Sequence, residues 1–284
     1  MSLVPRSFKA FRLGLIQLAT GADKARNLQN AASKVKEAVQ GKAQVVVLPE
    51  CFNSPYGTQY FPEYAESIDP PEQSYLALAK MAKDNDVYLV GGSIPEKKDG
   101  KLYNTSLCFD HKGELIGVHR KVHLFDIDVP GKIRFQESDC LSPGDKLTEI
   151  DTPYGKFGVA ICYDVRFPEM AMVAARNGCS AFLYPGAFNL TTGPLHWELL
   201  GRARAVDNQI FVALCSPARD MSASYNAYGH SIIVNPNGQV LAEAGTNEEI
   251  IYADCEPQAM EDTRKSIPVT TQRRFDVYEN VADK

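Results

Sequence analysis

The stretch KFGVAICYDVRFPEMAMVAARNGCSAFLYP, residues 156–185, decides the fold. Its first part, Lys156–Ile161, is a short apolar run that predicts a strand ending at Cys162. A helix is predicted over about Phe167–Asn177. A second apolar run, Ser180–Tyr184, is stopped by Pro185. Strands that alternate with helices in this way are typical of α/β proteins.

The rest of the chain continues this rhythm of short strands and helices. The further predicted helices are Ala25–Gln40, Glu72–Lys83 and Pro194–Val206. The further predicted strands are Phe11–Leu18, Gln44–Leu48, Val87–Gly91, Leu102–Asp110, Glu114–His119, Gln209–Leu214, His230–Asn235, Gln239–Ala242 and Glu249–Ala253. Between them, Lys121–Pro143 is predicted to be a long polar loop, and such loops are usually functional.

Many strands with few helices fit two sheets packed face to face with helices outside. No linker or abrupt change in composition interrupts the chain, so we expect one domain over residues 1–284, with a C-terminal arm from about residue 260. The seven cysteines are an odd number without a CxxC pair, which favours neither a zinc site nor a redox dithiol.

Charge and hydropathy exclude several classes of partner. The net charge is −5 and the basic residues are scattered, whereas nucleic-acid and membrane surfaces require a concentrated basic face. No apolar run approaches the roughly 18 residues of a membrane span. Residues 1–10 lack the apolar core of a secretory signal. We therefore expect a cytoplasmic protein, although Arg6, Ser7 and Lys9 leave a mitochondrial location open.

Three reactive residues each follow a predicted strand: Glu50, Lys121 and Cys162. Because ligands bind at the carboxyl ends of strands in α/β sheets, these side chains can converge. A thiol with a pKa of about 8.5 needs a base before it attacks an amide carbonyl, and Glu50 can serve as that base. Taken singly, Cys162 is more often a small core residue, Glu50 is usually a solvated loop residue or a charge at a helix N-terminus, and Lys121 is usually a solvated charge.

The charge that develops on the carbonyl oxygen would need donors. The Lys121 ammonium and the backbone N–H of Tyr163 are the candidates for this oxyanion site. Glu50 would then protonate the departing ammonia and later activate the water that hydrolyses a thioester on Cys162.

Five segments carry a resemblance to a known family. They are LPECFNSPY (48–56), HRKVHLF (119–125), GVAICYDVRFPE (158–169), YPGAFNLTTG (184–193) and RARAVDNQ (202–209). With these segments in this order, the chain resembles the nitrilase superfamily of carbon–nitrogen hydrolases, and within it the omega-amidase-like branch. The resemblance covers essentially the whole chain.

The resemblance implies that Glu50, Lys121 and Cys162 match the family's catalytic triad. Glu137 matches a second family glutamate that holds Lys121 and the substrate, with an ordinary loop carboxylate as the alternative. The implied fold is a four-layer α-β-β-α sandwich with two mixed sheets. The implied assembly is a homodimer in which the C-terminal arm reaches the partner.

The two residues after Cys162 indicate the class of substrate. Tyr163-Asp164 stands where nitrilases usually carry Trp-Glu, which favours an amide over a nitrile. Omega-amidases hydrolyse the terminal amide of short dicarboxylic monoamides such as 2-oxoglutaramate and 2-oxosuccinamate. The distal carboxylate of such a substrate needs a partner, and Arg166 is the main candidate because a guanidinium binds a carboxylate bidentately.

The remaining pocket candidates are weaker. Thr192 can add a hydroxyl donor, and Tyr56 and Phe125 can form walls. The alternative for Arg166 is a structural ion pair with Glu169 or Asp164. We expect no cofactor and no metal, because His119 and His123 are four residues apart but no third ligand is indicated.

Two rival functions stay open at this stage. One is another amidase of the same superfamily, acting on deaminated glutathione or on an N-carbamoyl amino acid. The other is a catalytically silent relative that serves as a binding protein. Intact Glu50, Lys121 and Cys162 favour an enzyme, because a silent relative has no physical need of all three.

Overall fold

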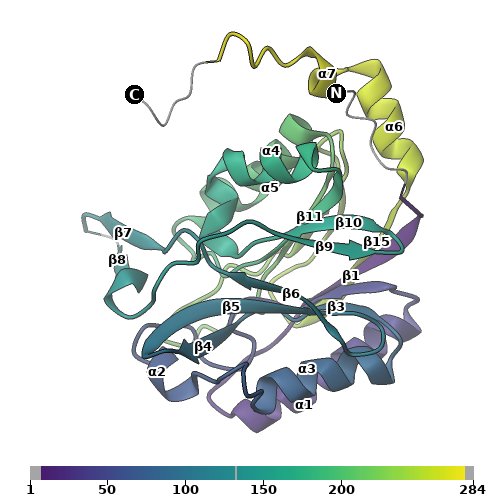
Figure 1. Ribbon diagram of the computed structural model, residues 1–284. Coiled ribbons are helices and arrows are strands. Elements are labelled where there is room, and N and C mark those ends of the chain that lie inside the picture. The colour runs from purple at the N-terminus through teal and green to yellow at the C-terminus, as the bar shows by residue number, and fades with distance from the viewer. Residues whose placement is uncertain (1–7, 132, 279–284) are drawn as a thin grey trace.

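Two large β-sheets lie face to face in the computed structural model, which describes residues 8–131 and 133–278. Helices α1 (Lys24–Gln40) and α3 (Gln73–Asp84) cover the outer face of the first sheet. Helices α4 (Pro168–Arg176) and α5 (Gly193–Asn208) cover the outer face of the second (Figure 1). The four-layer α-β-β-α sandwich predicted from the sequence is confirmed.

The first sheet has the strand order β15-β1-β2-β3-β5-β4, and β6 also pairs with β5. Its strands are β1 (Phe11–Gln17), β2 (Val45–Val47), β3 (Tyr88–Val90), β4 (Ile94–Lys98), β5 (Lys101–Phe109), β6 (Leu115–Arg120) and β15 (Glu249–Cys255). Strands β1, β2 and β3 are parallel, and the pairs around them are antiparallel.

The second sheet repeats this plan with the order β14-β13-β12-β11-β10-β9. Its strands are β9 (Thr148–Thr152), β10 (Gly155–Val159), β11 (Cys179–Pro185), β12 (Phe211–Cys215), β13 (Ile232–Val234) and β14 (Val240–Glu243). Strands β10, β11 and β12 are parallel, and β9, β13 and β14 extend them in antiparallel fashion. Each sheet is therefore mixed.

The core follows from the alternation of side chains along the strands. Val45 and Val47 of β2 belong to the cluster that includes the second sheet, whereas Val46 belongs to a second cluster with Leu28 and Val35 of α1. Burial of a side chain of this size stabilises the folded state by about 1.5–3 kcal/mol. The β2 strand is therefore fixed between two apolar layers.

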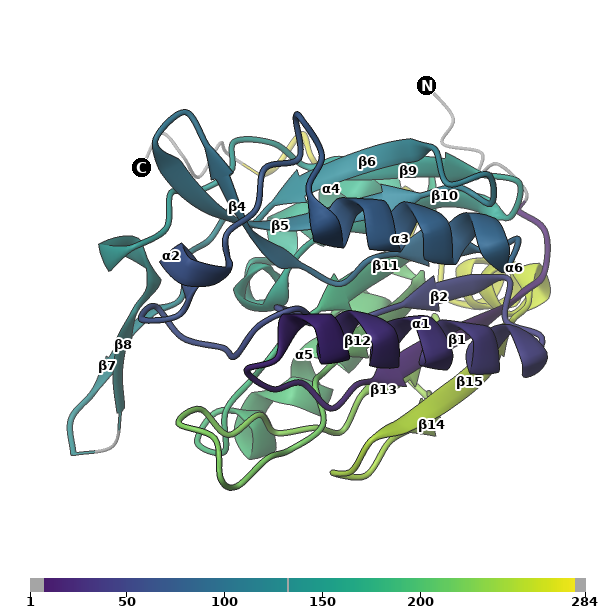
Figure 2. The same ribbon diagram turned by 90° about the horizontal axis from the view of Figure 1, so that it is seen from below.

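Several elements were not predicted from the sequence. Residues 121–143 were predicted to be a loop, but they contain a hairpin of β7 (Asp126–Val129) and β8 (Ile133–Gln136). Figure 2 shows this hairpin projecting from the sandwich. Strands β4 and β9 were also missed. Pro95 is tolerated in β4 because that strand lies at a sheet edge.

The chain ends in a helical segment. Helices α6 (Pro257–Ser266) and α7 (Val269–Gln272) lie beyond the layer of α4 and α5 (Figure 1), and the short helix α2 (Phe61–Tyr64) lies near β4. Residues 279–284 of the expected arm lie outside the described residues, as do Arg6 and Ser7. Within residues 8–131 and 133–278, we find no helix with the length and apolarity needed to cross a bilayer.

Candidate active site

Glu50, Lys121 and Cys162 lie close together, each one to three residues after the last residue of β2, β6 or β10. The Nζ atom of Lys121 lies 3.0 Å from Oε1 of Glu50 and 2.9 Å from Oε1 of Glu137. Lys121 and Glu137 are fully buried, and Glu50 and Cys162 are 1% and 3% exposed. Glu50 also contacts the Cys162 thiol, so the convergence expected from the strand ends is present and the site is buried.

Cys162 occupies a sharp turn between β10 and the 3-10 helix η2 (Cys162–Arg166). Its φ of 47° lies in the left-handed region, which is uncommon for a residue with a side chain and often marks a functional site. The sulfur accepts a hydrogen bond from the Ala187 N–H at 3.4 Å. A Cβ atom at Gly186 would lie 3.2 Å from the Cys162 Cα, so glycine permits this close approach.

The charge of Lys121 is balanced by two carboxylates. Burial alone lowers the pKa of the Lys121 ammonium, but Glu137, Glu50 and the Cys162 sulfur raise it, and the net pKa is well above the ordinary value. Lys121 therefore stays protonated, because loss of its proton would leave two buried carboxylates without a counter-ion. An ammonium fixed in this way can stabilise negative charge on a substrate oxygen.

The pKa values of the Glu50 carboxyl and of the Cys162 thiol are both raised. Burial raises the pKa of Glu50; Lys121 lowers it again and Glu137 raises it further. Burial and the Glu50 carboxylate hold the pKa of the Cys162 thiol well above its ordinary value. Within the described part of the chain, Oε2 of Glu50 has no hydrogen-bond partner. Glu50 thus offers a free acceptor for a proton from a thiol that is not ionised at rest.

The Glu137 carboxylate accepts hydrogen bonds from three donors outside η1. Its Oε1 accepts the Tyr56 hydroxyl at 2.7 Å, and its Oε2 accepts the Phe125 N–H at 2.7 Å. The third donor is Lys121. Glu137 opens the 3-10 helix η1 (Glu137–Asp139) directly after β8, so the unpredicted hairpin places this carboxylate. The structure brings Glu137 into the site rather than leaving it on a solvated loop.

Asn104 was not predicted to belong to the site. Its Nδ2 donates to Oε1 of Glu50 at 2.8 Å, and its backbone oxygen accepts the Lys121 N–H at 2.8 Å. Asn104 is 1% exposed in the middle of β5. A buried amide next to two further polar residues, Thr105 and Ser106, in a predicted strand was the available signal. It was hidden because Asn104-Thr-Ser also matches the glycosylation pattern.

Arg166 is half-buried and lacks a carboxylate partner among the described residues. Its Nη1 lies 3.1 Å from Nδ1 of His196, and its guanidinium lies 4.7 Å from the Phe188 ring centroid. Burial lowers the pKa of Arg166, while the Cys162 sulfur raises it. The alternative ion pair with Glu169 or Asp164 is not observed in residues 8–131 and 133–278.

Thr192 is less available than expected. It precedes α5, and its hydroxyl donates to Oδ1 of Asn189 at 3.1 Å. Tyr56 and Phe125 lie beside the site through their contacts with Glu137. The Tyr56 ring centroid is 4.4 Å from that of Tyr225, a residue that no motif singled out. A cavity of about 260 Å³ shares Tyr56, Tyr225 and Ala187 with the site.

The two histidines that resembled a metal pair have another role. Both bind the carboxylate of Asp164, His119 at 3.0 Å and His123 at 2.8 Å. In the described residues, no group of three or more candidate ligands is arranged to hold a metal ion.

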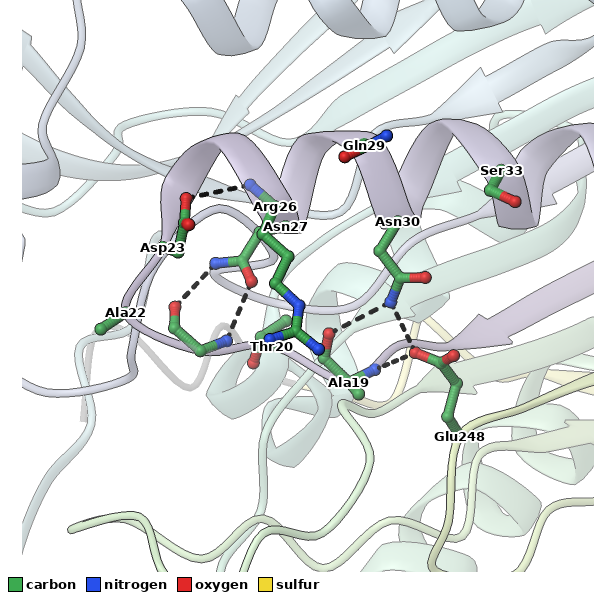
Figure 3. Close-up of a pocket in the computed structure, with 11 residues that line it drawn as sticks. Ala19, Thr20, Ala22, Asp23, Arg26, Asn27, Gln29, Asn30, Ser33 and Glu248 are labelled. Atoms are coloured by element: carbon green, nitrogen blue, oxygen red, sulfur yellow. Dashed lines mark hydrogen bonds between the residues drawn. The ribbon is translucent and has the colours of Figure 1, made fainter.

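A larger cavity of about 780 Å³ lies at the start of α1, and its lining includes none of the predicted site residues. Figure 3 shows polar side chains there that bond one another and nearby backbone, such as Asn27 with Gly21 and Asn30 with Glu248.

These observations can be compared with known proteins. The carbon-nitrogen hydrolase family model matches residues 12–265, and the chain belongs to this family. It is 63% identical over 280 residues to a hydrolase of Schizosaccharomyces pombe, covering 99% of this chain and 87% of the relative. It is 57% identical over 274 residues to omega-amidase NIT2 of Bos taurus, covering 96% of this chain and 99% of the relative.

The fold is shared with a solved structure as well. The crystal structure of Saccharomyces cerevisiae Nit3, a member of branch 10 of the nitrilase superfamily, matches with a TM-score of 0.87 at 51% identity. The match covers 94% of this chain and 97% of that chain. The resemblance to the nitrilase superfamily and its omega-amidase-like branch is confirmed.

Proposed function

We propose that this chain is a thiol amidase that hydrolyses the terminal amide of a small dicarboxylic monoamide, of the 2-oxoglutaramate or 2-oxosuccinamate type. The observation that carries the proposal is a buried thiol beside a carboxylate with a free oxygen and a fixed ammonium. The similarity to omega-amidase NIT2 supports the substrate class.

The first half of the reaction acylates Cys162. The free Oε2 of Glu50 takes the thiol proton as the sulfur attacks the amide carbonyl. The oxyanion is stabilised by the Lys121 ammonium and the Tyr163 N–H; near the start of η2, that N–H has no acceptor within its own helix. Glu50 returns the proton to the amide nitrogen, the C–N bond breaks, and ammonia leaves a thioester.

The second half restores the thiol. Glu50 removes a proton from a water molecule, which attacks the thioester carbonyl at the same oxyanion site. The C–S bond breaks, the sulfur regains the proton from Glu50, and the dicarboxylic acid leaves. Glu137 keeps Lys121 in place through both halves.

Substrate specificity depends on the end of the substrate that lies opposite the reacting amide. The guanidinium of Arg166, which contacts His196 but no carboxylate among the described residues, binds the distal carboxylate, while Tyr56 and Phe125 form walls. Thr192 contributes a hydroxyl after its bond to Asn189 opens. Amidases for deaminated glutathione or N-carbamoyl amino acids would use the same chemistry, so a substrate panel separates them.

The test is ammonia release from 2-oxoglutaramate, 2-oxosuccinamate, deaminated glutathione, N-carbamoyl amino acids and a simple nitrile. We expect the two dicarboxylic monoamides to be hydrolysed fastest. We expect the Cys162→Ala variant to release no ammonia above background. Wild-type activity no higher than that of Cys162→Ala on every substrate would favour the silent binding protein instead.

We also propose that the chain is one domain that forms a homodimer through α5. Leu195 and Leu199 of α5 are each 62% exposed, and Val206 is 48% exposed on the same face. The C-terminal arm would reach the second copy. Sedimentation of the wild type and of the Leu199→Glu variant tests the homodimer, and a monomeric wild type would contradict it.

A cytoplasmic location stays a prediction.

A further inference from the structure

The carboxylate of Asp164 accepts four hydrogen bonds and is fully buried. Its Oδ2 accepts the Ile161 N–H at 2.9 Å and Nε2 of His119 at 3.0 Å. Its Oδ1 accepts the N–H of His123 at 2.9 Å and the Nδ1 of His123 at 2.8 Å. Four donors around one buried carboxylate satisfy its capacity, so its position is tightly determined.

These four donors belong to the two segments that carry the thiol and the ammonium. Ile161 immediately precedes Cys162, while His119 and His123 lie two residues before and two residues after Lys121. Within the described residues, every hydrogen bond between 119–123 and 161–167 ends on Asp164. The carboxylate is therefore the direct polar connection between the nucleophile turn and the lysine turn.

The backbone at Cys162 needs hydrogen bonds that hold its conformation. Cys162 has a left-handed φ, which persists only where the surroundings hold it. Asp164 closes this turn twice, because its N–H donates to the Ile161 oxygen at 3.0 Å while its side chain accepts the Ile161 N–H. Without the carboxylate, the turn would lose its bond to the Ile161 N–H and its hydrogen bonds to the lysine segment.

The charge state suits this task. Burial alone would raise the pKa of Asp164, but hydrogen bonds from His119 and His123 outweigh burial and hold the pKa well below its ordinary value. The carboxylate therefore remains an acceptor for all four donors near neutral pH. The His123 ring is stacked on Phe167, with 3.6 Å between centroids and 9° between planes, so that donor is also oriented.

We propose that Asp164 is a positioning residue that sets the placement of the Cys162 sulfur relative to the Lys121 ammonium, and that His123 transmits this placement to the lysine segment. The proposal rests on the proposed function of Cys162 as the nucleophile. A displacement of about 1 Å at a reacting group can cost about 100-fold in rate. The effect should appear in kcat and hardly in KM, because substrate contacts are unchanged.

The test compares two substitutions at His123. His123→Phe removes the Nδ1 donor but keeps a ring against Phe167, whereas His123→Asn retains a donor near the Nδ1 position. We expect His123→Phe to lower kcat for 2-oxoglutaramate by about 10-fold or more, as for loss of one hydrogen bond to a charged group. KM should change by less than about 3-fold, and His123→Asn should recover most of the rate. Asp164→Asn should lower kcat by about 100-fold.

A second readout does not depend on the substrate. The rate at which iodoacetamide alkylates Cys162, followed by mass spectrometry, should fall in His123→Phe and recover in His123→Asn. The control is His111→Phe, because His111 forms a similar pair with Asp86 on the surface at 2.9 Å and should change neither rate. If the wild type hydrolyses no amide but alkylation still follows the His123 donor, the proposed function fails and the positioning role stands.

Two results would overturn the positioning role. One is a His123→Phe variant with wild-type kcat and alkylation rate. The other is a His123→Asn variant as impaired as His123→Phe, since a role in packing rather than in hydrogen bonding would produce that result. Should Asp164→Asn fail to fold, the His123 pair alone decides.

Discussion

The ammonium of Lys121 lies 3.0 Å from Oε1 of Glu50, although 71 positions separate the two residues along the chain. A second carboxylate, Glu137, shares the same ammonium at 2.9 Å. Two buried carboxylates around one ammonium leave a net negative charge, which disfavours a thiolate at Cys162. The geometry therefore fits a thiol that gives its proton to Glu50 during attack, rather than a thiolate stored at rest.

Removal of the shared cation should be costly. The Lys121→Met variant leaves Glu50 and Glu137 as uncompensated buried charges, and breaking a buried pair in this way typically destabilises a protein by about 3–5 kcal/mol. We expect a loss of that size in the free energy of unfolding, measured by urea denaturation, together with loss of amidase activity.

The control for this variant is Lys80→Met. Lys80 pairs with Asp84 at 2.6 Å, but its side chain is 75% exposed, and such pairs contribute about 0.3–0.5 kcal/mol. Equal losses of stability in the two variants would contradict the buried ion triad.

Asn104 should control the pH dependence of activity. Its amide donates to the Glu50 carboxylate, and a donor to the ionised form lowers a carboxyl pKa. The Asn104→Ala variant should therefore raise the pKa of Glu50 further. Because the proposed base Glu50 must be ionised to accept a proton, the acid limb of kcat/KM should move to higher pH. The measurement is a pH–rate profile of both proteins.

Asn208→Ala serves as the matched control for Asn104. Asn208 is also a buried amide, 2% exposed, but it donates to the Arg204 oxygen in α5. Its removal should lower stability without a shift in the acid limb. A shift toward lower pH in Asn104→Ala would disprove the role given to this amide.

Tyr56 should matter through its hydroxyl. Tyr56→Phe keeps the aromatic contacts but removes the donor to Oε1 of Glu137. We expect kcat/KM to fall by about 10-fold, as for loss of one hydrogen bond to a charged group. Tyr60→Phe is the control, because the Tyr60 hydroxyl contacts Ser224 in an exposed setting. Indistinguishable kinetics of Tyr56→Phe and wild type would exclude a contribution of this hydroxyl.

Arg166 should discriminate by the distal carboxylate of the substrate. Arg166→Lys keeps the charge but loses the planar pair of donors, so KM for 2-oxoglutaramate should rise by about 10-fold or more. KM for butyramide, which has no carboxylate, should stay within about 3-fold. A parallel rise for both amides would assign Arg166 to the fold instead.

The family resemblance predicted Glu50, Lys121 and Cys162 as the triad, and plain apolar runs predicted the strands that they follow. The same reasoning failed for β4, whose Pro95, Lys97 and Lys98 hide an edge strand, and for the hairpin of β7 and β8. Edge strands and hairpins outside the core carry no sustained apolar pattern, because they have little core to face.

Positioning residues were missed for a different reason. From the sequence, Asp164 is a mark of amide chemistry and a candidate ion-pair partner for Arg166, and His123 is part of a family segment and a metal-ligand candidate, but neither is predicted to be a positioning residue. Their hydrogen bonds cross 41 positions of chain, and nothing in local spacing reports such a contact. Asn104 was hidden in the same way, since its partner Glu50 lies 54 positions away.

The most direct measurement is the intact mass of the protein after acid quenching during turnover of 2-oxoglutaramate. An acyl-enzyme should appear with an added mass equal to that of the substrate less ammonia, and peptide mapping should locate it on Cys162. The adduct should be absent from Cys162→Ala. Ammonia release at the wild-type rate by Cys162→Ala, or an adduct on another residue, would contradict the thioester route.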